Sequence, residues 1–215
     1  MPRKTKPSEE RKDELIDAAE RLFSAKGYGE TAVSDIVHDL DVAQGTFYYY
    51  FKSKEDVLKA VIEHDLQTMR DEVGVVRQKT LDARSKLEGL INVILSFNEK
   101  RDSLYKYIHL EKNALLHEKF MRRLADIFTP IVREVLLEGI YQGLFHIRHA
   151  SETAEILLLV VAHLNDSVHF VQEPADHAHR QEAAEYFLCK LLGMEEGAFS
   201  LHFQETDYST TGTNW

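Results

Sequence analysis

A short run from Gln44 to Lys54 gathers side chains that are suited to contact with DNA. The amide of Gln44 can pair bidentately with the edge of an adenine, and Thr46 can meet a thymine methyl group or a phosphate. Gly45 allows close approach because it has no side chain, while tyrosine hydroxyls and a lysine ammonium suit phosphate oxygens. The predicted contact residues in this run are therefore Gln44, Gly45, Thr46, Tyr48, Tyr49 and Lys54.

A helix is the element that can present this run on one surface. Successive helix residues are rotated by about 100°, so three consecutive tyrosines cannot all face one core. Phe47, Tyr50 and Phe51 follow the i, i+3, i+4 spacing of an inward stripe. The rest of the run, including Gln44 and Tyr49, then faces away from the core, which predicts an exposed contact surface.

The residues before this run predict two further helices. A first apolar-periodic segment begins near Ser8 and ends at Gly27. A second begins at Thr31, a residue type favoured at the N-cap, and carries apolar residues on one face at positions 33, 36, 37 and 40. A tight turn at Asp41 and Val42 separates it from the aromatic helix. This order predicts a helix-turn-helix, in which Thr31 and the positive end of its helix clamp a phosphate across the groove.

Two stretches of this head resemble a known family. They read Thr-Ala-Val-Ser-Asp-Ile-Val from residue 31 and Leu-Asp-Val-Ala-Gln-Gly-Thr-Phe-Tyr-Tyr-Tyr-Phe-Lys-Ser-Lys-Glu from residue 40. This ordered set resembles the TetR family of ligand-responsive transcriptional repressors. The resemblance implies an all-α protein, with a three-helix head on a larger helical body that binds ligand and dimerises. It also implies a homodimer that binds a palindromic DNA operator and is released by a small-molecule effector, with Thr31 and Ala43 among the DNA contacts.

Three residues depart from the usual pattern of that family, which has threonine, glycine and serine where this chain has Ala32, Asp41 and Ala43. Ala32 removes a hydroxyl that can contact phosphate, and Ala43 removes one that can cap the recognition helix. Aspartate tolerates a left-handed turn, so the turn at Asp41 survives. These departures keep an alternative open, in which the head belongs to an interaction or adaptor protein with weak or no DNA binding.

Every segment after residue 81 reads as helix, without strand alternation. The predicted helices cover 81–100, 103–116, 118–145 with Pro130 as a kink or break, 152–171 and 177–192. The predicted domains are a DNA-binding head at 1–55, an effector-binding and dimerisation body at 56–203, and a polar tail at 204–215.

Dimerisation is expected because one head reads only a few base pairs. Useful specificity requires two copies about one DNA turn, 34–36 Å, apart. The resemblance implies that the last two long helices pair with those of a second copy. Their apolar residues are Ala154, Leu157, Leu158, Val161, Leu164 and Val168 on one helix and Ala183, Ala184, Phe187, Leu188, Leu191 and Leu192 on the next. Packing inside one subunit is the alternative for these residues.

The resemblance also implies an effector pocket between the early and late body helices. The candidate ligand-binding residues are Phe97, Tyr105, Tyr107, His109, Glu111, Phe120, Asn165 and His169. Aromatic rings near a carboxylate suit a flat or cationic molecule.

The sequence favours a sensor over an enzyme. It contains no nucleophile elbow, phosphate loop or metalloprotease motif, so neither a catalytic residue nor a cofactor is predicted. The histidine clusters are His146-x-x-His149, His163-x-x-Asp166-x-x-His169 and His177-x-His179. None has cysteine partners or a matching third ligand, so surface histidines are predicted there rather than a metal site.

Composition and charge agree with an intracellular DNA-binding regulator. The single cysteine, Cys189, excludes an intramolecular disulfide, and the longest apolar run, 156–164, is too short to span a bilayer. With no apolar segment at the start, a cytoplasmic protein without membrane association is expected. Residues 1–60 hold 10 Lys/Arg and 12 Asp/Glu out of a total net charge of −10, so most of the acidity lies in the body.

Overall fold

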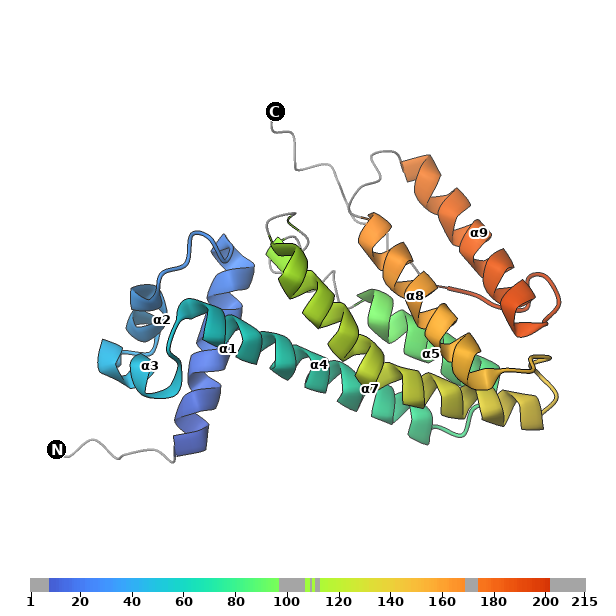
Figure 1. Ribbon diagram of the computed structural model, residues 1–215, viewed down its shortest axis with the longest axis horizontal. Coiled ribbons are helices and arrows are strands. Elements are labelled where there is room, and N and C mark those ends of the chain that lie inside the picture. Colours follow the sequence, from blue (N-terminus) through green and yellow to red (C-terminus); the bar gives the residue numbers. More distant parts are fainter. Residues whose placement is uncertain (1–7, 97–106, 109, 111–112, 169–173, 202–215) are drawn as a thin grey trace. The chain divides into compact units, whose positions relative to one another are not determined.

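The computed structural model describes residues 8–96, 107–108, 110, 113–168 and 174–201, with the side chains of 165–168 and 174–178 left out. Throughout these ranges the regular elements are helices, and none is a strand (Figure 1). They are α1 (Ser8–Lys26), α2 (Val33–Asp39), α3 (Gln44–Tyr50), α4 (Lys54–Gln78), α5 (Ala83–Ser96), α7 (Ala114–Tyr141), α8 (Ala150–Val168) and α9 (Pro174–Leu192). The predicted all-α fold, with a helix-turn-helix first and a larger helical body after it, is confirmed.

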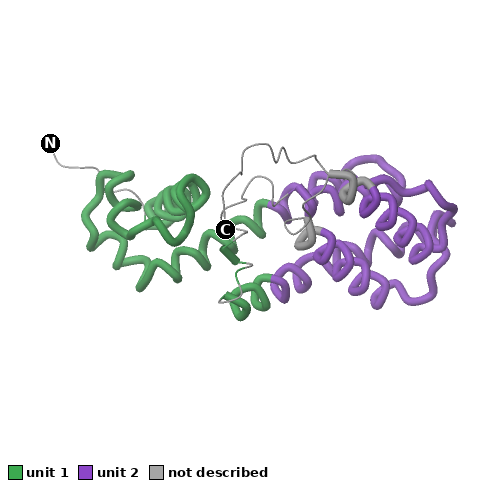
Figure 2. The backbone as a smooth tube through the Cα atoms, turned by 90° about the horizontal axis from the view of Figure 1, so that it is seen from above, with its two compact units in different colours: residues 1–68, 101–120 green, residues 69–100, 121–215 purple. Residues whose placement is uncertain are grey.

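The chain divides into two compact units, coloured separately in Figure 2. Unit 1 contains residues 1–68 and 101–120, and unit 2 contains residues 69–100 and 121–215. Two helices, α4 and α7, contribute residues to both units. The boundaries at 55/56 and 203/204, which separate the predicted DNA-binding head, body and tail, remain predictions.

The core of the head forms where the apolar spacing predicts it. Leu15, Ala18, Ala19 and Phe23 recur every three or four residues on α1, and all four are fully buried. Helix α2 packs on α1 and α3 on α2. Two ion pairs also join α1 to α2, from Arg21 to Asp39 at 2.7 Å and from Lys26 to Asp35 at 2.6 Å. The hydrogen bond from Lys26 holds the pKa of Asp35 below its ordinary value.

The turn between α2 and α3 is a Schellman motif, although its left-handed residue is not glycine. The backbone N–H of Asp41 donates to His38 O, and that of Val42 donates to Val37 O, at 3.1 and 3.0 Å. Asp41 has a φ of 50°, and it is the one residue other than glycine with a positive φ in the described part of the chain. The prediction that aspartate sustains this turn is confirmed.

Helix α4 begins directly after a serine cap and extends to Gln78. Ser53 precedes its first residue, and its Oγ accepts a hydrogen bond from the backbone N–H of Asp56 at 3.1 Å. The apolar side chains of Val57, Leu58 and Val61 are fully buried in the head. The sequence predicts an end near residue 69 or 73, whereas the helix continues to Gln78.

In the body, Pro130 is predicted to kink or break the third helix, and the structure shows no break there. A single helix, α7, begins at Ala114 and continues through Pro130 to Tyr141. Proline lacks the N–H that would bond the carbonyl four residues earlier, yet one missing bond does not end a helix that packing holds on both sides. The last helix, α9, begins at Pro174 rather than at 177, and proline suits the first helical position because its missing N–H would be unpaired there anyway.

Helices α5, α8 and α9 pack together in unit 2, with α8 between the other two (Figure 1). Most residues predicted for a dimer interface lie inside this unit. Those buried within the chain are Ala154, Leu157, Leu158, Val161, Ala184, Leu188 and Leu192. Each helix has a second apolar edge, and its exposed residues are Ile156 and Leu159 on α8 and Tyr186 and Phe187 on α9. Of the predicted interface residues, Ala183 and Phe187 are exposed, so the apolar face available to a partner overlaps the predicted one only in part.

Candidate DNA-reading surface and effector region

The predicted contact residues of α3 form one exposed face. Gln44 and Gly45 are exposed, as is Ala43 just before the helix, and Thr46 is half-buried. Tyr49 is 77% exposed, whereas Phe47 on the opposite face is completely buried. Because Phe47 and Phe51 anchor this seven-residue helix in the core, its polar face is held in place without a ligand.

The start of α3 is open to close approach by a flat or extended partner. Ala43 is the N-cap, with φ −71° and ψ 147°, and its side chain offers no acceptor to the first backbone N–H groups. A methyl group added at Gly45 would have no atom within 4 Å. The N–H of Thr46 donates to Ala43 O at 2.8 Å, and the N–H groups before it have no side-chain cap, which suits a phosphate oxygen.

Ring packing orients the three tyrosines. Tyr48 meets the buried Phe47 edge to face at 5.5 Å, and Tyr49 meets Tyr50 edge to face at 4.8 Å. The phenol of Tyr50 accepts an exposed hydrogen bond from Ser8 at 3.4 Å, and Tyr50 is half-buried, unlike the buried Phe47 and Phe51. Tyr48 and Tyr49 are both exposed.

Thr31 lies in the loop before α2 and does not occupy the position that its residue type predicts. The N-cap is Ala32, whose backbone N–H donates to the Asp35 carboxylate at 2.8 Å. Thr31 is only 2% exposed, and its hydroxyl donates to Gly27 O at 2.7 Å. In this conformation the hydroxyl is occupied by the loop and is not presented to a phosphate.

Lys54 also donates hydrogen bonds to the loop between α1 and α2. Its ammonium donates to Tyr28 O at 2.7 Å and Thr31 O at 2.8 Å, with a longer bond to Gly29 O at 3.4 Å. The same Nζ lies 4.2 Å from the centre of the Tyr28 ring, in cation–π geometry. Burial lowers the pKa of Lys54, opposed by the nearby carboxylates of Glu30 and Asp35.

The Tyr28 ring extends this cluster to Tyr107, a predicted effector residue. Their ring centres are 4.2 Å apart, and on its other side Tyr28 meets the buried Phe23 at 5.0 Å. Burial, and then Tyr107 itself, raise the pKa of Tyr28 to about 12. All these residues belong to unit 1, so a segment distant in sequence is packed directly on the reading head. Sequence spacing holds no signal for this pairing.

The structure describes only part of the predicted effector set. Tyr107 is half-buried and Phe120 is buried, while Asn165 lies on α8 with its side chain outside the description. Phe97, Tyr105, His109, Glu111 and His169 fall outside the described residues. Whether this set forms one pocket therefore stays a prediction.

The predicted histidine clusters lie on the surface where they are described. His146, His149, His163 and His179 are exposed. Within the described ranges, none of these clusters brings three potential metal ligands together. His169 is not described, and for His177 only the backbone is.

Across the helices that the structure describes, none is both long and apolar enough to cross a membrane.

Two sequence models of one family match the chain. That of the bacterial regulatory proteins of the tetR family covers residues 15–61, and that of the tetracyclin repressor-like C-terminal domain covers residues 95–186.

Similar proteins include two from sequence comparison and one of known structure. The fatty acid metabolism regulator protein of Bacillus subtilis (strain 168) is 26% identical over 132 residues, 60% of this chain and 68% of that protein. The HTH-type transcriptional repressor KstR2 of Rhodococcus jostii (strain RHA1) is 26% identical over 138 residues, 63% of this chain and 68% of that protein. A transcriptional regulator from Saccharomonospora viridis, solved in complex with choline, has a TM-score of 0.64 at 21% identity, covering 84% of this chain and 96% of that one. This last likeness concerns the fold alone.

Proposed function

We propose, from the premise that this chain belongs to the TetR family of transcriptional regulators, that it is a repressor whose homodimer binds a palindromic operator and is released by a small molecule. Proteins of this family are DNA-binding regulators and not enzymes, so the chain needs no catalytic residue. A DNA partner of this kind would place the protein in the cytoplasm. KstR2, which is named a repressor, supports repression over activation.

The exposed polar face of α3 carries this proposal. Gln44 would read a base edge in the major groove, with Gly45 and Thr46 close to the DNA. Ala43, Tyr48 and Tyr49 would line the phosphates on either side. The burial of Phe47 and Phe51 behind this face fixes it on the head, so little conformational entropy is lost on binding.

Thr31 and Lys54 would support this surface in a different way from the one their residue types predict. Both are bonded to carbonyl groups of the α1–α2 loop. Their part in binding would be to hold α2 and the start of α4 in place. Backbone N–H groups at the start of α2 would then take the phosphate that the Thr31 hydroxyl does not reach.

A homodimer would form through the exposed apolar edges of α8 and α9. Ile156 and Leu159 lie three residues apart on α8, and Tyr186 and Phe187 are adjacent on α9. The two helices pack side by side, so these edges belong to one unit. A two-fold axis beside them would make the four-helix pairing that the family resemblance implies.

Release would depend on the packing of Tyr107 against Tyr28. An effector that binds near Tyr107 better in one arrangement of this contact would shift the head toward that arrangement. The coupling needs only about 1–3 kcal/mol. The aromatic residues near Tyr107 suit a flat or cationic molecule. Choline bound to the structural relative from Saccharomonospora viridis supports the cationic class.

Selection of bound duplexes from a random DNA pool by the purified full-length protein tests the proposal. The expected result is a two-fold symmetric sequence with half-sites about one turn apart, bound with a steep salt dependence. An unenriched pool, together with weak and salt-insensitive binding, would contradict the proposal and favour the adaptor alternative. Choline can then be tested for release of the selected duplex.

A further inference from the structure

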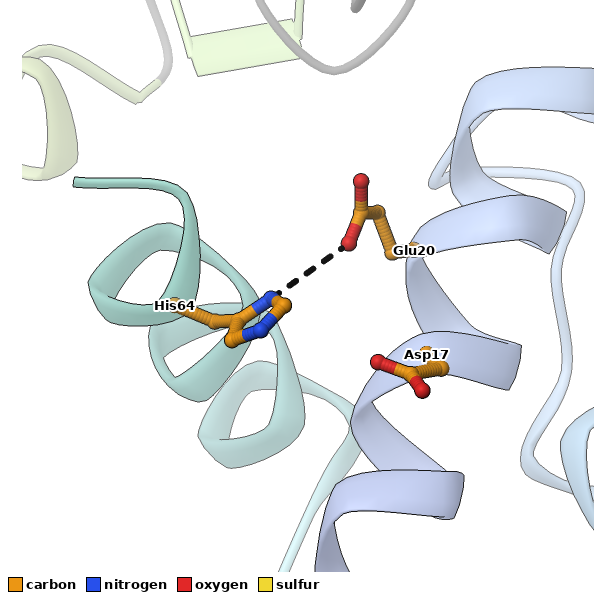
Figure 3. A group of neighbouring side chains, drawn as sticks. All are labelled: Asp17, Glu20 and His64. Atoms are coloured by element: carbon orange, nitrogen blue, oxygen red, sulfur yellow. Dashed lines mark ion pairs between the residues drawn. The ribbon is translucent and has the colours of Figure 1, made fainter. Parts of the chain in front are cut away.

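Helices α1 and α4 bring three potential metal ligands together on the head (Figure 3). Asp17 and Glu20 project from α1, three residues apart and therefore on one side of that helix. His64 projects from α4 toward them, and its Nδ1 lies 3.6 Å from a carboxylate oxygen of Glu20. One ligand atom from each of the three side chains lies within 4.8 Å of the others.

These separations suit one ion between the two helices. Zinc binds imidazole nitrogen and carboxylate oxygen at about 2.0–2.2 Å, so neighbouring ligands in a tetrahedral site are about 3.3–3.5 Å apart. The Glu20 and His64 atoms already lie near that separation. Asp17 and His64 are exposed and Glu20 is half-buried, so small side-chain rotations can close the remaining gap and water can fill the fourth position.

We propose that Asp17, Glu20 and His64 form a binding site for Zn²⁺ on the outer surface of the head. The donor set selects for this class of ion. An imidazole ligand disfavours Mg²⁺ and Ca²⁺, which take oxygen ligands, and the lack of a thiolate disfavours Cu(I). Two carboxylates also neutralise the charge of a divalent cation. The site is independent of the operator proposal, since it uses none of the predicted DNA or effector residues.

Zinc bound in this site would cross-link α1 and α4. Asp17 and Glu20 lie near the middle of α1, and His64 lies near the middle of α4. Both helices carry buried side chains of the head core, among them Ala18 and Val61. An ion that binds the folded head and not the separated helices therefore raises its unfolding temperature.

The sequence does not reveal this site because its ligands come from two helices that are distant along the chain. Asp17-x-x-Glu20 alone is an ordinary pair on a helix surface, and His64 has no histidine at metal-ligand spacing. Only the crossing of α1 and α4 brings the three together. The compact histidine pairs, such as His146 and His149, attract attention in the sequence instead.

Zinc titration of the full-length, tag-free, chelator-treated protein tests the proposal by calorimetry and by thermal unfolding, with excess Mg²⁺ present. His64→Gln and Asp17→Asn should each weaken binding at one site by about tenfold or more and remove the rise in unfolding temperature. His38→Gln is the matched control, because it removes another exposed histidine of the head and should bind zinc as the wild type does. Co²⁺ should report the same site through weak visible bands without a thiolate band.

Two results would overturn the proposal. Wild-type affinity in both His64→Gln and Asp17→Asn would assign the zinc to other surface histidines. An absence of zinc binding by the wild type under Mg²⁺ competition would leave the three side chains as an ordinary ion-pair cluster. Circular dichroism of each variant without metal separates a lost site from a misfolded head, and Asp17→Asn, at an exposed position, preserves side-chain volume for that comparison.

Discussion

At the scale of single residues, Gln44 and Lys54 belong to the same predicted contact region but have different surroundings. Gln44 is exposed, whereas Lys54 bonds three carbonyl groups of the α1–α2 loop. We therefore expect Gln44→Ala to keep the stability of the free protein and relax discrimination at one base position, by about 1–3 kcal/mol. Affinities for the selected operator and its single-base variants measure this effect.

For Lys54→Ala the structure predicts a loss of stability in the absence of DNA. Removing the ammonium leaves part-buried carbonyl acceptors without their donor, which costs about 1–3 kcal/mol. The neighbouring Lys52 is exposed, so Lys52→Ala should leave stability unchanged and reduce the salt slope of DNA binding by about one if that lysine reaches a phosphate. Urea unfolding of the two variants shows whether Lys54 stabilises the free protein more than Lys52 does. Equal stabilities would mean that Lys54 does not support the loop.

Tyr28 provides a pH dependence whose direction follows from its surroundings. Its pKa rises from the ordinary tyrosine value of 10.0 to about 12 in the folded head, mainly because burial opposes the charged phenolate. Below pH 10 both the folded and the unfolded chain keep this proton, so the contribution of Tyr28 to stability is fully present. As pH rises from about 10 to 12, the unfolded chain loses the proton first and the free energy of unfolding falls.

Tyr28→Phe should therefore lose less stability than the wild type over that alkaline window. Urea midpoints at about pH 8, 10 and 11 measure the difference. Tyr49→Phe is the control. Tyr49 is exposed on α3, so removal of its hydroxyl should leave the pH profile of the wild type unchanged. Parallel profiles for all three proteins would show that Tyr28 ionises freely in the folded state.

Residue types predict roles that depend on neighbours in sequence better than roles that depend on folding. Ser53 is followed at the right spacing by Asp56, and the cap forms between these two near neighbours. Thr31 has the right type for an N-cap, but Tyr28 and Gly27 fold back over it and bury its hydroxyl. No local sequence pattern predicts the conformation of that loop, because Lys54, which bonds to it, comes from a later helix.

At the scale of elements, the short helix α3 lacks a side-chain cap. Its N-cap, Ala43, has the extended backbone that serine adopts at such positions, so serine fits without strain. We expect Ala43→Ser to raise the free energy of unfolding by about 1 kcal/mol and to strengthen operator binding. Ala43→Val, which offers no oxygen, should do neither. Equal unfolding midpoints for the serine and valine variants would show that the cap is not limiting.

Two helix glycines test whether packing or propensity decides at each position. A methyl group at Gly139 on α7 would lie 2.0 Å from the buried ring of Phe145, whereas one at Gly74 on α4 meets no atom within 4 Å. Gly139→Ala should therefore destabilise the protein by about 1–3 kcal/mol through overpacking. Gly74→Ala should stabilise it by up to about 1 kcal/mol through helix propensity. Chemical unfolding of both variants gives the comparison, and a stabilised Gly139→Ala would mean that Phe145 moves freely.

At the scale of the whole molecule, apolar periodicity predicts which segments are helices but not what covers each face. Helix α8 has apolar residues around most of its circumference, so Leu157 and Leu159 look alike in the sequence. The fold buries Leu157 against its own subunit and leaves Leu159 68% exposed. A helix within a dimeric body needs two such faces, one for its own core and one for its partner, and only the packed structure separates them.

This separation makes the proposed homodimer testable without disturbing the subunit. Leu159→Glu and Phe187→Glu place a charge on exposed edges, so each monomer should fold normally. A two-fold interface carries every substitution twice, and each variant should raise the dimer dissociation constant at least about tenfold, which corresponds to about 1.4 kcal/mol. Sedimentation velocity across a concentration series measures the dissociation constant.

The control for these two variants is a third charge on an exposed ring outside the proposed interface. Tyr141 is 93% exposed at the end of α7 and belongs to neither α8 nor α9, so Tyr141→Glu should leave the dimer intact. Because two joined heads bind an operator far more tightly than one, Leu159→Glu and Phe187→Glu should also lose operator affinity at concentrations where they are monomers. Wild-type dissociation constants in both variants would place the dimer interface on another surface of the body.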